Sequence, residues 1–160
     1  MIKKTYKNVP KEYVDAVNNL FNIKKNERFM NDSCAHAELL ADLIIGQTSS
    51  QAEALIYSGE LPISCYKSAI EQTKATKIKI LLDNLDENKF TVFGDKLLNK
   101  IEFRQKKESI KGMNHFFVCG DAYRYEKDHN VGTAISNFNE PSMVKKLTES
   151  FNKMWEWSAD

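Results

Sequence analysis

The chain has few of the residues that cross-link or break a fold: 3 cysteines, 3 prolines and 6 glycines in 160 residues. So little glycine and proline excludes a collagen-like or low-complexity chain. The cysteines, Cys34, Cys65 and Cys119, are odd in number and far apart. This spacing predicts reduced thiols in a cytoplasmic protein and argues against a disulfide framework or a zinc site.

The chain also has little net charge and no long apolar segment. Its formal charge is +1 at pH 7, so neither a basic nor an acidic surplus calls for an oppositely charged partner. No apolar run approaches the roughly 20 residues of a membrane span, and no apolar signal region follows the basic start. We therefore expect a cytoplasmic protein with no membrane contact.

What charge there is lies unevenly along the chain. Residues 1–31 contain seven basic and three acidic side chains, several of them in a run at 24–28. We predict an N-terminal helix and basic connector over residues 1–31, followed by one domain over residues 32–160. A single domain of this length has room for one hydrophobic core.

Hydrophobic periodicity predicts both helices and strands in this domain. Helical patterns occupy about 10–22, 32–50, 62–74, 92–99 and 141–155. Strand patterns occupy 54–57, 78–83, 100–104, 115–119, 122–126 and 131–138. The early alternation of helix and strand is typical of parallel pairing, and the later short strands are typical of hairpins. The predicted fold is α/β: a mixed sheet of about six strands with helices on both faces.

Several short phrases resemble the phospholipase D-like superfamily. They are ALIYSGELP at 54–62, KIKILLD at 77–83, HFFV at 115–118, SNFN at 136–139 and MW at 154–155. The resemblance covers roughly residues 33–157 and implies a single phospholipase D-like repeat. It implies a site built on the motif His-x-Lys-x4-Asp, followed by a Gly-Ser/Thr pair and an Asn. In that chemistry the His attacks a phosphodiester and the Lys holds the phosphate charge, without a metal.

The chain departs from this motif at two of its three positions. His115 stands in the place of the nucleophile, but Phe117 occupies the Lys position. Ala122 occupies the Asp position, with Asp121 one place early. Losing the charged phosphate ligand removes several kcal/mol of transition-state stabilisation, on the order of 10²–10³ in rate. We therefore expect a catalytically degenerate module.

The resemblance also implies what such a module does. Expected ligands are nucleic acid or another phosphate-bearing molecule, and expected partners are a second copy of the chain and a protein of the same system. A bacterial DNA-processing or defence system is the context expected by analogy. The alternative is a metal-independent phosphodiesterase or nuclease that uses His115 with a rebuilt phosphate site. No cofactor and no metal are expected, because the histidines and cysteines lack ligand spacing.

Two strand residues are candidates for this site, each with a structural alternative. His115 begins a strand, where a histidine is either a catalytic group or a half-exposed structural residue. Arg124 and Glu126 share one face of their strand, while Tyr123 and Tyr125 share the other. Arg124 is either a substitute phosphate ligand beside His115, since a guanidinium grips two phosphate oxygens, or half of an ion pair with Glu126.

The remaining candidates follow predicted strands or lie within one. Glu60 and Asp83 follow the two parallel strands, at the edge where ligands of open α/β sheets gather. Alternatively, Glu60 caps the next helix and Asp83 starts a turn. Gly132-Thr133 and Ser136-Asn137 resemble the family's Gly-Ser-x-Asn segment with an enlarged hairpin between. The resemblance implies that Ser136 and Asn137 are ligand-binding residues.

Overall fold

The computed structural model describes residues 4–49, 51–58, 63–85, 93–108, 114–128 and 133–158. Its helical segments are α1 (Lys11–Ile23), α2 (Ser33–Ala41), the π-turn η1 (Asp42–Gly46), the 3-10 turn η2 (Ile63–Tyr66), α3 (Lys67–Gln72), α4 (Gly94–Leu98) and α5 (Pro141–Trp157). Its strands are β1 (Phe29–Asp32), β2 (Ala54–Ser58), β3 (Ile78–Leu82), β4 (Ile101–Gln105), β5 (Phe116–Cys119), β6 (Ala122–Asp128) and β7 (Thr133–Asn137). None of the helices in these ranges is both long and apolar enough to cross a membrane.

The strands form one open mixed sheet in the order β1-β7-β6-β5-β2-β3-β4. The three strands β2, β3 and β4 are parallel neighbours, as the alternation of helix and strand predicts. The other neighbours are antiparallel. The strands β5, β6 and β7 follow one another in the chain, whereas β2–β5 and β1–β7 pair across longer connections. The predicted α/β class with a mixed sheet is confirmed, with seven strands in the described residues in place of about six.

The strand that the sequence did not predict is β1, at the edge of the sheet. It pairs with β7 in register Met30↔Ile135 and Asn31↔Ala134. Its four residues include only two apolar ones and end in Asn31 and Asp32, so no period-2 pattern marks them as a strand. Pairing with β7 makes this segment a strand, and the predicted division between residues 31 and 32 falls inside it.

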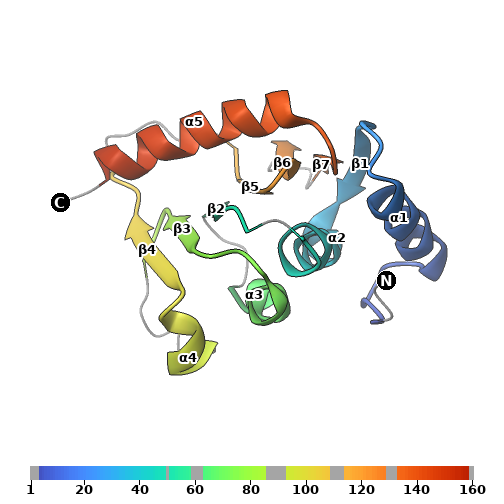
Figure 1. Ribbon diagram of the computed structural model, residues 1–160, viewed down its shortest axis with the longest axis horizontal. Coiled ribbons are helices and arrows are strands. Elements are labelled where there is room, and N and C mark those ends of the chain that lie inside the picture. The colour runs from blue at the N-terminus through green and yellow to red at the C-terminus, as the bar shows by residue number, and fades with distance from the viewer. Residues whose placement is uncertain are drawn as a thin grey trace.

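Helices cover both faces of the sheet, as Figure 1 shows, with α5 on one side and α1 to α4 on the other. The inner stripe of α5 packs against alternate strand residues such as Tyr57, Leu81 and Phe116. Phe151 is 0% exposed in this layer and stacks on Trp155. The closing helix is therefore an integral layer of the domain, because its apolar stripe is buried against the sheet.

The second helix ends earlier than its apolar pattern predicts. It was expected to continue to about residue 50, but α2 passes into η1 and stops at Gly46. A Cβ on Gly46 would lie 3.2 Å from Ala69 Cα in α3. The glycine therefore allows a close contact between the two helical segments.

Candidate functional site

His115 lies just before β5, beside the carboxyl ends of the parallel strands. Because β5 runs antiparallel to β2 with Phe116 opposite Tyr57, the start of β5 meets the end of β2. The next strand, β6, places Glu126 beside it, and the Glu126 N–H donates to the His115 carbonyl at 2.9 Å. Ligand sites of open α/β sheets gather at this edge.

Both ring nitrogens of His115 face carboxylates. Its Nε2 lies 3.4 Å from Asp83 Oδ2, and its Nδ1 lies 3.6 Å from Glu126 Oε2. The Tyr57 ring meets the imidazole edge-on at a centroid distance of 5.1 Å, and the Tyr57 hydroxyl donates to Asp83 Oδ1 at 2.9 Å. With 12% of its side chain exposed, His115 is held in one orientation at the surface of the sheet edge.

Tyr57 acts in this cluster as a fixed hydrogen-bond donor. Burial, followed by its hydrogen bond to Asp83, raises the pKa of the Tyr57 phenol. The phenol therefore stays protonated and orients the carboxylate that faces His115 Nε2.

Arg124 connects this cluster to the far edge of the sheet. Its side chain is 4% exposed, and its Nη1 lies 3.5 Å from Glu126 Oε1. Its Nε donates to Asn31 Oδ1 at 2.7 Å, and Asn31 Nδ2 donates to Ser136 Oγ at 2.8 Å. Polar contacts thus run from His115 to Ser136 across β5, β6, β1 and β7. The side chains in these contacts are those of His115, Glu126, Arg124, Asn31 and Ser136. Together with Asp83 and Tyr57 we call them the His115 cluster.

The two motif positions that lack the family's Lys and Asp are both buried. Phe117 is 1% exposed and packs in the core, with its ring edge-on to Tyr66 at 5.9 Å. Ala122 is buried, and Asp121 lies in the β5–β6 turn, at the other end of β5 from His115. Within the described ranges, Arg124 supplies the positive charge of the His115 cluster.

The structure therefore brings together His115, Arg124, Asp83 and Ser136 of the predicted site residues. Asn137 lies elsewhere: its amide donates to Glu140 Oε1 at 2.9 Å and to Asn26 Oδ1 at 2.8 Å. Glu60 and Gly132 lie outside the described residues.

Asn137 belongs to a second polar cluster, centred on Glu140 at the start of α5. The Glu140 carboxylate accepts hydrogen bonds from Arg28 Nε at 2.9 Å, the Tyr123 hydroxyl at 2.8 Å and Asn137. The Arg28 guanidinium, followed by these neutral donors, lowers the pKa of Glu140 to about 2, against the penalty of burial. This cluster fastens the segment before β1 to β6, β7 and α5.

Sequence reasoning missed Asn31, Tyr57 and Glu140 as members of these clusters. Asn31 lies in the unpredicted strand, and Tyr57 has the pattern of an ordinary buried strand residue. Glu140 precedes Pro141 at a predicted helix start, which marks it as a helix-cap position only. A signal was available for Glu126, which shares a strand face with Arg124.

No family model matches the chain, and no curated protein matches it in sequence. Solved structures do resemble it. Polyphosphate kinase from Porphyromonas gingivalis matches with a TM-score of 0.61 at 9% identity, over 96% of this chain. TrmBL2, an archaeal chromatin protein with a novel mode of DNA binding, matches with a TM-score of 0.56 at 16% identity, over 92% of this chain.

The mixed α/β fold of this chain is similar to the folds of both proteins. At these identities the likeness shows the fold alone. The chain spans 59% of the length of the TrmBL2 chain and 30% of the polyphosphate kinase chain. Within the described part of the chain, no group of three or more His, Cys, Asp or Glu side chains is placed to hold a metal ion.

Proposed function

We propose that this chain is a phospholipase D-like module that binds nucleic acid or another phosphate-bearing ligand without cleaving it. The observation that carries the proposal is the burial of Phe117 in the core at the position of the family's lysine. The ligand class is supported by the two structural neighbours, one of which binds DNA while the other is a polyphosphate kinase.

The charges around His115 support binding without chemistry. A phosphohistidine mechanism needs positive charge where the phosphate oxygens gather. Here Asp83 and Glu126 face the two ring nitrogens, and two carboxylates repel a phosphate unless positive charge balances them. Arg124 balances one of them, so the cluster lacks the surplus of positive charge that a phosphohistidine step needs.

We further propose that the module pairs with a second copy of itself, as small relatives of this superfamily do. The pairing surface is the edge of the sheet at which His115 lies. The proposed context is a bacterial DNA-processing or defence system, which supplies a protein partner. Pairing there brings two His115 clusters together. Light scattering on wild-type protein and on His115→Glu, which places extra negative charge at the shared edge, tests it. We expect a dimer for the wild type and a monomer for the variant, and a wild-type monomer refutes pairing.

The binding proposal is tested with labelled single- and double-stranded DNA and RNA, with and without a chelator. We expect retention of at least one nucleic acid and no shortening of any. His115→Ala and His36→Ala form a matched pair, because His36 stacks on Tyr13 outside the His115 cluster. Metal-independent cleavage that persists in His36→Ala and is lost in His115→Ala overturns the proposal.

One observation favours the second candidate, a metal-independent phosphodiesterase or nuclease. Glu126 Oε2 lies 3.6 Å from His115 Nδ1, where a carboxylate orients an imidazole and stabilises its positive charge. In this reaction His115 Nε2 attacks phosphorus, the bond to the leaving oxygen breaks, and water then releases the phosphate from the histidine. Intact-mass detection of a covalent phosphate adduct after quenching in alkaline denaturant, which preserves the P–N bond, supports this candidate if the adduct is absent in His115→Ala. No mass increase with any nucleic acid refutes it.

A further inference from the structure

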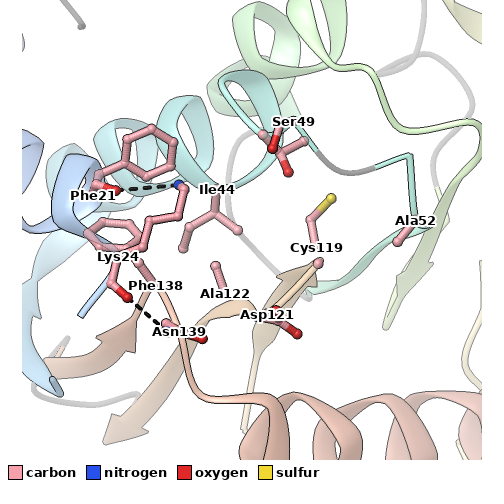
Figure 2. A pocket seen from close by; sticks show the side chains of 12 residues that line it. Phe21, Lys24, Ile44, Ser49, Ala52, Cys119, Asp121, Ala122, Phe138 and Asn139 are labelled. Atoms are coloured by element: carbon pink, nitrogen blue, oxygen red, sulfur yellow. Dashed lines mark hydrogen bonds between the residues drawn. The ribbon is translucent and has the colours of Figure 1, made fainter. Parts of the chain in front are cut away.

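A pocket of about 470 Å³ opens at the end of the sheet opposite His115. It lies between the end of α1, the residues after η1, the β5–β6 turn and the connection from β7 to α5, as Figure 2 shows. Its volume falls within the range of small-molecule sites. None of the residues of the His115 cluster lines it, so it is a separate site.

One wall of the pocket is apolar and aromatic. Phe21 and Phe138 meet edge-on at a centroid distance of 5.3 Å, and Ile44 and Ala122 continue the wall. Cys119 lies at the floor, where burial raises the pKa of its thiol and the Thr48 side chain partly offsets the rise. The thiol is therefore protonated and behaves as a small apolar group. This wall accommodates an apolar body.

Lys24 supplies a positive charge at the rim of this wall. Its ammonium lies 3.7 Å from the centroid of the Phe21 ring, and its Nζ donates to the Phe21 carbonyl at 3.4 Å. Desolvation lowers the pKa of this ammonium. Across the ranges that the structure covers, no carboxylate forms an ion pair with Lys24. An anion of a ligand would therefore meet a partly desolvated cation without a competing carboxylate.

The backbone holds Lys24 in this position. Lys24 follows α1 directly as its C-cap residue, with φ 49°, and its N–H donates to the Leu20 carbonyl at 3.1 Å. Its own carbonyl accepts from Asn139 Nδ2 at 2.8 Å, across the pocket rim (Figure 2). The cation is therefore carried by a backbone fixed on two sides.

Asp121 supplies a negative charge from the β5–β6 turn, a different side of the pocket from Lys24 (Figure 2). The turn is anchored, because the Glu140 N–H donates to the Asp121 carbonyl at 2.9 Å. A carboxylate at the rim attracts an ammonium group and repels the second charge of a dianion such as phosphate. From one cation, one anion and an apolar wall, we infer that this pocket binds a small amino-acid-type zwitterion with an apolar side chain.

The test uses three probes that share one aromatic body. L-Phenylalanine carries both charges, 3-phenylpropionate lacks the ammonium, and 2-phenylethylamine lacks the carboxylate. Binding to the full chain is followed by calorimetry and by shifts of the Thr48 and Ala122 amide resonances. Because each charge has its own partner, L-phenylalanine is expected to bind about tenfold or more tightly than either analogue.

Three variants assign the charges. Lys24→Met and Asp121→Asn are each expected to weaken L-phenylalanine binding by about tenfold, while Lys25→Met, on the neighbouring residue outside the pocket lining, leaves it unchanged. Unchanged thermal unfolding of each variant shows that the fold is intact. The inference is overturned if L-phenylalanine shifts no pocket resonance, if an analogue binds as tightly as L-phenylalanine, or if Lys25→Met weakens binding as much as Lys24→Met. Nucleic-acid binding is measured separately and bears only on the His115 cluster.

Discussion

Replacing Glu140 with glutamine removes one negative charge and leaves the shape of the side chain nearly unchanged. The folded carboxylate is matched by the Arg28 guanidinium and by hydrogen bonds from Tyr123 and Asn137. These groups lower the pKa of Glu140 from 4.5 to about 2. A difference of this size corresponds to about 3 kcal/mol of folding free energy at most.

The expected loss is smaller, because Arg28 is 61% exposed and water screens its charge. We expect Glu140→Gln to lower the free energy of unfolding by about 1–3 kcal/mol at neutral pH. Since the pKa is lower in the folded state, the contribution of the carboxylate is complete above the unfolded pKa. It is lost as the pH falls from about 4.5 to about 2, so the two proteins should converge in acid.

Urea unfolding followed by circular dichroism, at about pH 7 and about pH 3, measures both quantities. Glu149→Gln is the matched control, because Glu149 is an exposed glutamate on α5. It should change stability by less than about 0.5 kcal/mol. Equal effects of the two substitutions at neutral pH refute the role of the Glu140 charge. A Glu140→Gln deficit that persists unchanged in acid shows that shape, and not charge, is responsible.

Three further perturbations test the core, the His115 cluster and the ligand class. Phe151→Ala should lower the free energy of unfolding by about 3–5 kcal/mol, because the side chain is fully buried. A melting temperature that falls by only a degree or two, which corresponds to a loss of about 1 kcal/mol or less, contradicts this packing. Asn31→Ala removes the hydrogen bonds that Asn31 makes with Arg124 Nε and Ser136 Oγ. It should lower the free energy of unfolding, measured in urea, by about 1–3 kcal/mol. A variant as stable as wild type argues against a stabilising role of these two hydrogen bonds. Phosphate affinity at neutral pH should be lower in Arg124→Ala than in wild type, because the guanidinium supplies the positive charge of the His115 cluster. Equal affinities of the two proteins mean that Arg124 does not bind anions at this edge.

The sequence predicts the parts of the His115 cluster better than their arrangement. His115, Arg124, Asp83 and Ser136 can be singled out, because strand alternation and the ends of parallel strands are local features. Which groups contact which depends on register between strands. Pairing of β5 with β6 places Glu126 between His115 and Arg124, so the carboxylate faces the imidazole at 3.6 Å. No local pattern encodes that order.

Local periodicity was enough to predict the helices, six of the strands and the α/β class, because each depends on side chains a few residues apart. Tertiary contacts decided the rest. Phe29–Asp32 becomes a strand only by pairing with β7, and the second helix stops where Gly46 meets Ala69. Lys24 and Asp121 lie almost a hundred positions apart in sequence, yet they line one pocket. The physical reason is that periodicity reports which face of an element is buried, whereas packing alone selects what that face meets.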